Sequence, residues 1–405
     1  MSPARGPALA GAALALVASV GAACLSAWPR GSAVAPGDGR HLTVGTAWGF
    51  VLLLTLATAA YAIALVLLRG SGASRLAAVA AVAVVVQVVP LGAPLLLSTD
   101  AWTYWGYGRI AVEGGNPYLD PPAETELGSA SRYVGAEWRE TTSVYGPAFT
   151  LASEPIARAA GSSASAAAWL HKSLASGAIV AAAVLAARLA RRRALALAAV
   201  GWNPVLAVHM GGGGHNDAWV GALLAAALLL AATGRDRWSG GFWTLAILVK
   251  WIPAVFLVLH WLAPARTRRP RLAGLVVAGL VILGLATWRY GLAWTRALVP
   301  LAENAAHETS YALSSRLEEV GVPRGLALAL ALAGFVAGAT WLVRESRASR
   351  PRLGRAACLV LCTTPYLAVW YLGWAVPLAA ADDDDVALLG VLALSAYLLP
   401  QTIPL

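Results

Sequence analysis

Apolar residues occur along this 405-residue chain in long runs separated by short polar or basic segments. The stretch "TAWGFVLLLTLATAAYAIALVLL" from Thr46 to Leu68 is typical. An apolar run of about 20 residues is long enough to cross the ~30 Å hydrocarbon core of a bilayer as a helix. The pattern therefore predicts an all-α polytopic membrane protein, with spans near 7–28, 46–68, 76–97, 166–190, 195–210, 216–233, 271–289, 323–343, 356–378 and 386–404.

The segment 240–263 does not fit a single span. It carries Lys250 and Pro253 at its middle and has basic residues beyond both ends. Proline disrupts a helix, and non-helical backbone at membrane depth is tolerated where it lines a cavity. We therefore predict two half-helices that return to the side they entered from, which gives about 11–13 transmembrane or re-entrant helices in all.

Basic residues mark alternate boundaries of the predicted spans. Because cytoplasmic loops carry an excess of Lys and Arg, these clusters predict a multi-pass plasma-membrane protein with a cytoplasmic N-terminus. The clusters are Arg69 with Arg75, Arg188 with 191–193, 234–237, 265–271 and 344–355.

Two polar segments fall on the predicted outer face, 98–165 and 290–322. The first is the larger, is rich in carboxylates, aromatics and proline, and ends in a short apolar stretch expected to lie along the membrane interface. No linker separates folding units, so residues 1–405 are expected to form one domain.

Composition agrees with this class. Charged residues make up 12% of the chain, about half of what is usual for soluble domains. The net charge of +10 is explained by basic loops next to anionic lipid headgroups, so a nucleic-acid partner is not expected. The cysteines Cys24, Cys358 and Cys362 lie in apolar runs, where thiols act as small hydrophobic residues, and no disulfide is expected.

Asp100 directly follows the span that ends "APLLLST". A lone carboxylate there could simply mark the membrane boundary. The segment "STDAWTYWGYGR", however, also contains Tyr104 and Arg109 close to Trp102 and Trp105. An interfacial aromatic belt explains the rings but not the charges, whereas a sugar site needs both.

The stretch "GGGGHND" at 211–217 interrupts two apolar runs. Glycines allow sharp turns and close approach of backbone to a ligand. Asn216 or Asp217 could be no more than a helix N-cap. His215 is not expected to bind a metal, because no second His or Cys lies at ligand spacing. The start of the following helix would favour an anion such as phosphate.

Lys250 lies at the middle of an apolar segment, where a charge usually faces a cavity and marks function. Snorkelling or a structural ion pair is the alternative. The later segment "CTTPYLAVWYLGWAVPLAA" places Trp370 and Tyr371 in one predicted span. Core aromatics are the default interpretation of these rings, and a groove for an isoprenoid tail is the functional one.

The chain resembles the actinobacterial polyprenol-phosphate-mannose-dependent α-(1→6)-mannosyltransferases, which are GT-C glycosyltransferases of lipomannan assembly. The motifs "STDAWTYWGYGRIAVEGGNPY", "SVYGPAF", "NPVLAVHMGGGGHNDAW", "LVKWIP" and "TTPYLAVWYLGWAVP" carry the resemblance over roughly residues 98–380. It implies a GT-C fold with a large extracytoplasmic first loop. It also implies a polyprenol-phosphate-mannose donor and a lipoglycan acceptor.

The resemblance also implies a mechanism on the extracytoplasmic face. Asp100 acts as general base on the acceptor hydroxyl, which attacks the anomeric carbon with inversion while lipid phosphate departs. Lys250, His215 and Arg109 are the candidates for the donor phosphate. Asn216, Asp217, Tyr104 and Tyr145 are the candidates for sugar or acceptor. No cofactor is implied, and a divalent metal is left open because Asp100 lacks an acidic neighbour.

Other functions remain open at this point. A GT-C transferase could use another polyprenol-phosphate sugar or form an α-(1→2) linkage. A lipid-linked-sugar transporter would predict inverted repeats and paired broken helices, whereas the sequence indicates one broken helix and no repeat. An inactive scaffold in cell-envelope assembly is a third alternative.

Overall fold

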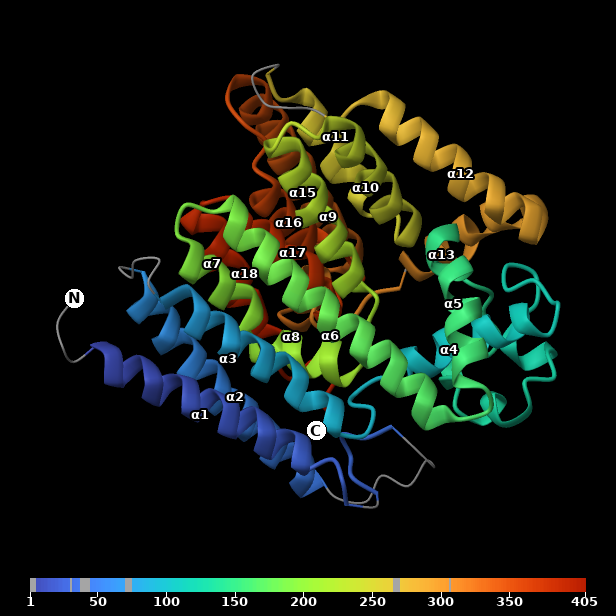
Figure 1. The fold of residues 1–405 in the computed structure, drawn as a ribbon, viewed down its shortest axis with the longest axis horizontal. Coiled ribbons are helices and arrows are strands. Elements are labelled where there is room, and N and C mark those ends of the chain that lie inside the picture. The colour runs from blue at the N-terminus through green and yellow to red at the C-terminus, as the bar shows by residue number, and fades with distance from the viewer. Residues whose placement is uncertain (1–4, 30, 37–43, 70–74, 265–269, 306) are drawn as a thin grey trace.

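The helices of this protein form one elongated bundle with a smaller lobe at one end (Figure 1). A computed structural model describes residues 5–29, 31–36, 44–69, 75–264, 270–305 and 307–405. These residues contain no β-strand. The helix bounds are α1 Arg5–Leu25, α2 Val44–Leu68, α3 Leu76–Val88, α4 Asp100–Val112, α5 Pro147–Ala160, α6 Ala164–Leu189, α7 Arg193–Gly201, α8 Pro204–Leu206, α9 Asp217–Ala232, α10 Asp236–Val249, α11 Pro253–Leu262, α12 Leu272–Tyr290, α13 Leu298–Ala305, α14 Leu313–Glu319, α15 Arg324–Ala348, α16 Leu353–Thr363, α17 Leu372–Ala381 and α18 Asp385–Tyr397.

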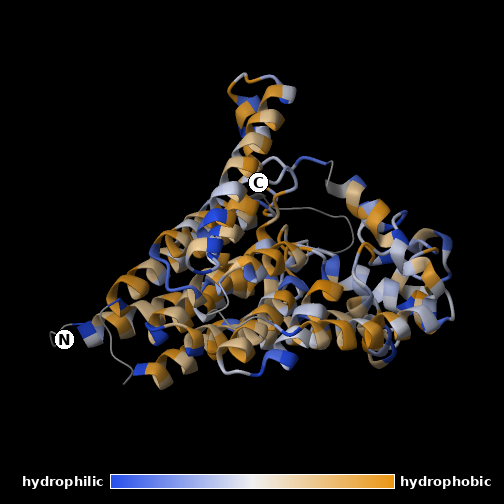
Figure 2. Cartoon of the chain, turned by 90° about the horizontal axis from the view of Figure 1, so that it is seen from above, coloured by the Kyte–Doolittle hydropathy of each residue, from blue (hydrophilic) through white to orange (hydrophobic). Residues whose placement is uncertain are grey.

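Six helical segments of the described residues are long and apolar enough to cross a membrane. Apolar residues dominate these helices, and polar residues concentrate toward chain ends and loops (Figure 2). The prediction of an all-α polytopic membrane protein is therefore confirmed. The six segments are Arg5–Leu25, Gly45–Leu68, Ala164–Leu189, Arg193–Gly212, Leu272–Glu303 and Arg324–Ala348.

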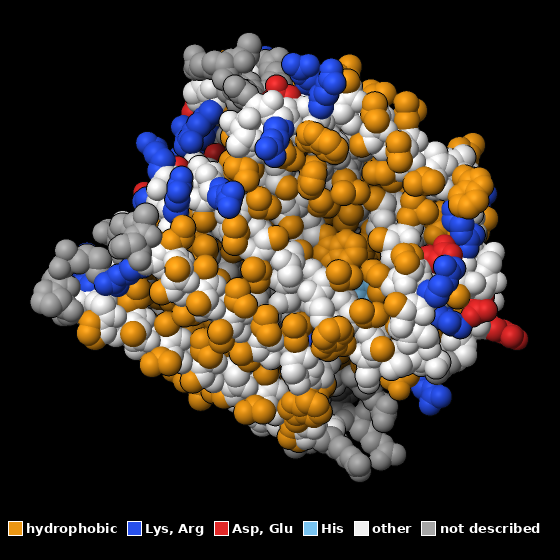
Figure 3. Space-filling view, viewed as in Figure 1, with side chains coloured by type: hydrophobic (Ala, Val, Ile, Leu, Met, Phe, Trp, Pro, Cys, Tyr) orange, Lys and Arg blue, Asp and Glu red, His pale blue; other side chains and the backbone are white. Residues whose placement is uncertain are grey.

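Arginines gather at one end of the bundle, which we call the arginine-rich end. There α6 ends and α7, α10, α12 and α16 begin. Figure 3 shows Lys and Arg along that edge, an apolar face across the middle, and charges of both signs over the lobe. The opposite end, which carries α4 and α5, is called the loop end.

The segment 240–263 forms the two half-helices expected from its sequence. Helix α10 ends at Val249, and α11 begins with Pro253 as its first residue. Trp261 Nε1 donates to Pro270 O at 3.5 Å, and Arg271 N donates to Asp236 O at 2.9 Å. The two half-helices therefore share their open end, at the arginine-rich end, which confirms the predicted hairpin. Residues 265–269 of the basic cluster 265–271 lie outside the described residues.

The prediction of one span at 356–378 was wrong, because this segment is a second hairpin. Helix α16 ends at Thr363, just before Pro365, which cannot continue a helix. Helix α17 starts at Leu372 and runs back, so that Gly354 N donates to Asp382 Oδ2 at 3.3 Å. Both hairpins open at the arginine-rich end and present their tips toward the loop end. The described part of the chain thus contains two broken-helix hairpins, where the sequence indicated one.

Proline also shortens two predicted spans. The span expected at 76–97 is helical only to Gly92, with a 3₁₀ turn after Val88 that contains Pro90. The span expected at 386–404 is helical only to Tyr397, three residues before Pro400. Ala93, which precedes Pro94, is extended with φ −81° and ψ 163°, as is usual for a residue before proline. Pro400 has no N–H with which to continue the second helix.

Helix α17 lies at the centre of the bundle, and every residue from Leu372 to Ala380 is buried. A Cβ at Gly221 of α9 would lie 2.2 Å from Gly373 O, so only glycine permits this close approach. Small residues let helices pack closely in membranes, where packing rather than apolar burial holds them together. The many alanines of these helices thus form the surfaces through which the helices pack against one another.

Four consecutive aspartates, 382–385, join α17 to α18 at the arginine-rich end. Asp383 accepts from Arg191 N at 2.8 Å, and Asp384 accepts from Arg355 Nε at 2.6 Å. Asp385 pairs with Arg192 at 2.5 Å. These contacts tie together the first residues of α7, α16 and α18.

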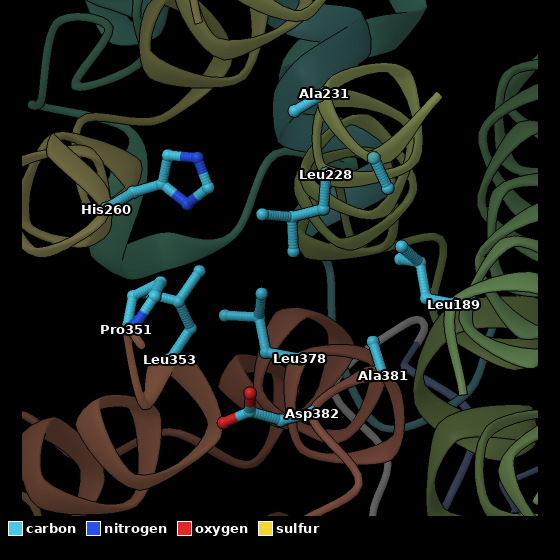
Figure 4. A pocket seen from close by; sticks show the side chains of 10 residues that line it. Leu189, Leu228, Ala231, His260, Pro351, Leu353, Leu378, Ala381 and Asp382 are labelled. Atoms are coloured by element: carbon cyan, nitrogen blue, oxygen red, sulfur yellow. The ribbon is translucent and has the colours of Figure 1, made fainter. Parts of the chain in front are cut away.

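Asp382 faces a cavity of about 400 Å³ between the open ends of the two hairpins. Figure 4 shows its carboxylate there, with His260 of α11 across the space. Burial raises the pKa of Asp382 to about 6 from its ordinary 3.8. The folded protein therefore favours the neutral acid. The resulting stability is complete below about pH 4 and is lost as the pH rises through about 6.

Asp382→Asn is expected to raise the free energy of unfolding by up to about 3 kcal/mol at pH 8. The gain should shrink steadily between pH 7 and pH 4, as wild-type Asp382 becomes neutral. Thermal unfolding of the purified protein in detergent measures both. Asp384→Asn is the matched control: burial opposes its ionisation, but Arg355 lowers its pKa below the ordinary value. This variant should lose stability at neutral pH, and a gain in both variants would contradict the assignment.

Candidate active site

A cavity of about 130 Å³ lies where the tips of both hairpins meet the start of α4. It is small, and a carboxylate, a lysine and several aromatic rings surround it. Its lining is Asp100, Trp138, Val144, Tyr145, Lys250, Leu301, Thr364, Tyr366, Trp370 and Tyr371. Residues far apart in the sequence thus converge on Asp100.

The backbone before α4 fixes the position of Asp100. Leu97 has a φ of +59°, a left-handed conformation uncommon for a residue with a side chain. Ser98 Oγ accepts from Asp100 N at 3.1 Å, and α4 starts at Asp100. Tyr104 is one turn later on the same helix face, and its hydroxyl donates to Asp100 Oδ2 at 3.1 Å. The carboxylate is held in place although the residue is only 6% exposed.

His215 lies directly behind Asp100. Its Nδ1 is 3.1 Å from Asp100 Oδ2, and its ring stacks on Trp370 with centroids 4.5 Å apart. Gly214 has a φ of +76°, which turns the chain so that His215 points at α4. The His215 side chain is 0% exposed, so it contacts the carboxylate rather than the cavity.

The pKa of Asp100 lies below its ordinary value. Burial alone would raise it. The electrostatic interaction and hydrogen bond with His215, the charge of Lys250 and the hydrogen bond from Tyr104 together outweigh burial. A lowered pKa favours the carboxylate form of Asp100 at neutral pH.

Asp217 and Lys250 form an ion pair beside Asp100. Lys250 Nζ donates to Asp217 Oδ2 at 2.7 Å, and Trp374 Nε1 donates to Asp217 Oδ1 at 3.1 Å. Lys250 Nζ also lies 5.1 Å from the centre of the Tyr371 ring. Asp217 is fully buried, whereas the Lys250 side chain is 20% exposed and lines the cavity. The ammonium therefore connects a buried carboxylate to the cavity.

The four glycines of "GGGGHND" pack tightly against neighbouring segments of the protein and leave no room for a ligand. A Cβ at any of the four would lie within 3.2 Å of other protein atoms. The first two glycines end a π-helical turn, Ala207–Gly212, a feature that is frequent at functional sites. Asn216 stands at the N-cap of α9 but makes no side-chain capping bond. Its amide Nδ2 and Oδ1 are buried and have no hydrogen-bond partner among the described residues.

Arg109 does not belong to this cavity. It lies nine residues after Asp100 on α4, which is about 13 Å along a helix, and it pairs with Glu113. Its expected contact with the donor phosphate is therefore not supported by the fold, because the helix carries it away from Asp100.

The other predicted residues do come together. Tyr104, Tyr145, Lys250, Trp370 and Tyr371 line the cavity or touch a residue that does. Trp370 and Tyr371 lie beside the carboxylate itself rather than in a separate groove.

The sequence interpretation missed several contributors: Trp138, Val144, Leu301, Thr364 and Tyr366. Thr364 and Tyr366 lie beside Pro365 in the quoted motif, and this proline was the signal that could have indicated them. Trp138 and Leu301 carried no signal, because only the folding of the two outer segments brings them to α4. Among the described residues, no group of three or more His, Cys, Asp or Glu could hold a metal ion.

Apolar helices surround a carboxylate, a lysine and aromatic rings at the meeting point of two broken-helix hairpins. This arrangement defines an all-α polytopic membrane protein of GT-C type. The family model described as "Alpha-(1->6)-mannopyranosyltransferase, N-terminal domain" matches residues 7–268. This chain belongs to that family.

Relatives with this name occur in several actinobacteria. A probable alpha-(1→6)-mannopyranosyltransferase of Mycolicibacterium smegmatis is 31% identical over 216 residues, which are 49% of this chain and 38% of that protein. Alpha-(1→6)-mannopyranosyltransferase A of Mycobacterium tuberculosis is 28% identical over 344 residues, which are 74% of this chain and 66% of that protein.

Alpha-(1→6)-mannopyranosyltransferase B of Corynebacterium glutamicum is 27% identical over 375 residues, which are 79% of this chain and 62% of that protein. The matched regions thus cover at most 66% of these relatives. No solved structure matches this chain.

Proposed function

We propose that this protein transfers mannose from polyprenol-phosphate-mannose to a hydroxyl of a lipoglycan acceptor, forming an α-(1→6) linkage with inversion at the anomeric carbon. The observation that carries the proposal is that Asp100 and Lys250 line one aromatic cavity in a chain of this family. The names of the relatives supply the sugar and the linkage.

The reaction needs a base and a site for a departing anion. Asp100 accepts the proton of the acceptor hydroxyl as its oxygen bonds to the anomeric carbon. The bond from that carbon to the phosphate oxygen breaks, and polyprenyl phosphate leaves with the electron pair. A nearby cation stabilises the charge that develops on the leaving oxygen. Lys250 is the basic side chain that lines the cavity with Asp100.

Asp217, Asn216 and the aromatic rings have supporting roles. Asp217 orients Lys250 through their 2.7 Å contact. The unpartnered amide of Asn216 is available for sugar hydroxyls or bound water, because buried polar groups are nearly always hydrogen-bonded. Tyr145, Trp370 and Tyr371 offer apolar faces to the sugar and the first isoprene unit.

The distribution of charge supports an extracytoplasmic location for the reaction. The arginine-rich end fits the cytoplasmic side under the positive-inside rule, which supports an extracytoplasmic cavity. A transporter would need discontinuous helices in inverted repeats. Both hairpins here open at the same end, which favours a transferase.

The test is transfer of labelled mannose from synthetic polyprenol-phosphate-mannose by the purified protein, with linkage analysis of the product. A labelled α-(1→6) product is expected. Transfer from polyprenol-phosphate-arabinose or -glucose alone would replace the donor assignment, and an α-(1→2) product would replace the linkage.

His215→Ala is expected to lower kcat by about 10- to 100-fold and to leave the KM for the donor nearly unchanged. The reason is that His215 is buried against Asp100 and positions the base, and a small misplacement of a catalytic group is costly. Steady-state kinetics with varied donor measures both constants. His307→Ala, at an exposed histidine, is the control. A raised donor KM with a normal kcat would instead indicate that His215 binds the donor phosphate and does not position Asp100.

A further inference from the structure

A second cavity, of about 470 Å³, opens on the loop end next to the one that contains Asp100. It lies between the outer segment after α4 and the helix α13 with the 3₁₀ turn before it. Its volume is in the range of ligand pockets, whereas the cavity at Asp100 is much smaller. Its lining is Tyr118, Leu119, Glu140, Thr141, Thr142, Arg296, Val299, Pro300 and Glu303.

The two cavities share both of their walls. In the outer segment, Trp138 and Val144 line the cavity at Asp100, and residues 140–142 between them line the second cavity. In α13, Leu301 lines the first cavity, and Glu303 two residues later lines the second. The cavities are therefore neighbours along one surface.

Hydrogen bonds hold the first wall in shape. Tyr107 Oη donates to Thr141 O at 2.9 Å, and Tyr118 Oη donates to Tyr145 O at 3.2 Å. Asn116 Nδ2 donates to Tyr290 O at 2.9 Å, which ties the segment to α12. The wall is thus built before any ligand arrives, and a preformed wall reduces the entropy lost on binding.

The lining of the second cavity suits a neutral, hydroxyl-rich ligand. Glu140, Arg296 and Glu303 form no ion pair with one another or with other described residues. Two carboxylates against one guanidinium leave the lining with a net negative charge, which repels phosphate. Carboxylate and guanidinium groups make strong hydrogen bonds to hydroxyls, and the hydroxyls of Thr141 and Thr142 can both donate and accept.

We propose that the second cavity binds the sugar units of the acceptor that lie next to the reacting one, so that this enzyme recognises a short stretch of neutral, α-linked mannose oligosaccharide. This inference rests on the proposed mannosyl transfer and adds to it the part of the acceptor that is recognised. The charge of the lining excludes the donor phosphate from this cavity, so donor and acceptor bind on different sides of Asp100.

The test compares acceptors of increasing length, from the single sugar methyl α-mannoside to an α-(1→6)-mannotetraoside, in the wild type and in Glu303→Gln. Wild-type KM should fall as the acceptor lengthens. Glu303→Gln should raise the KM for the tetraoside by about tenfold, because a charged hydrogen-bond partner is lost, and should leave the KM for methyl α-mannoside and for the donor unchanged. Glu126→Gln, at an exposed glutamate of the same outer segment outside the cavity, should behave as wild type.

Equilibrium binding of free α-(1→6)-mannotetraose, without donor, tests the cavity independently of transfer. Wild type and Glu126→Gln should bind it equally, and Glu303→Gln about tenfold more weakly. Equal loss for both acceptor lengths, or wild-type transfer that does not depend on length, would overturn the subsite and leave the mannosyl transfer standing. Absence of mannosyl transfer to every acceptor would instead overturn the proposed function and, with it, this inference.

Discussion

Asp100→Asn is expected to fold like the wild type and to lose mannosyl transfer by at least about 100-fold, the usual contribution of a general base. The amide nearly matches the carboxylate in shape and still accepts from Tyr104. It cannot, however, take the proton of the acceptor hydroxyl. The measurement is the initial rate of labelled mannose transfer by protein purified in detergent.

Two further readouts make this result specific to the base. The donor KM of Asp100→Asn should stay near the wild-type value, because Lys250 and the aromatic rings are unchanged. Glu124→Gln, at an exposed carboxylate of the same outer segment, should keep full activity. Near-normal turnover of Asp100→Asn would remove Asp100 as the base, whatever its position in the cavity.

Lys250→Met and Asp217→Asn should each destabilise the protein by about 3–5 kcal/mol, the usual cost of leaving one partner of a buried ion pair uncompensated. Asp217 is fully buried, and the contact to Lys250 is 2.7 Å. The double variant should lose clearly less than the sum of the two single variants, because it leaves no unpaired charge. Thermal unfolding of the purified proteins measures the cycle.

Arg109→Met is the matched control for this cycle. Arg109 and Glu113 form a more exposed pair one turn apart on α4, and such pairs contribute about 1 kcal/mol or less. If the two single variants at Lys250 and Asp217 were as mild as Arg109→Met, the pair would not be the buried contact described here.

The same double variant separates structure from catalysis. It should recover most of the stability lost in Lys250→Met, yet still show a raised KM for the polyprenol-phosphate donor, because the cation at the cavity is missing. Acceptor affinity should remain close to wild type. Recovery of donor KM together with stability would mean that Lys250 only balances the charge of Asp217.

The sequence alone determined the class of protein and most of its helices. Runs of apolar residues long enough to cross a bilayer leave few alternatives, because polar backbone must be satisfied internally in lipid. The hairpin at Lys250 was also visible, since a charge and a proline together are hard to place in a continuous span. Asp100, His215, Asp217 and Lys250 were all singled out, because charged and helix-breaking residues are rare in such segments.

Only the tertiary structure decided which of these residues line the cavity, which lie behind Asp100 and which lie away from it. It turned the predicted span around Pro365 into a second hairpin, since one proline can kink a helix or end it, and packing of α17 against α9 selects the second outcome. It carried Arg109 away from Asp100 along α4 and placed His215 behind the carboxylate. The distances between these side chains and the burial of each one are set by contacts between segments far apart in the chain. Such contacts cannot be derived from the order of residues within one segment.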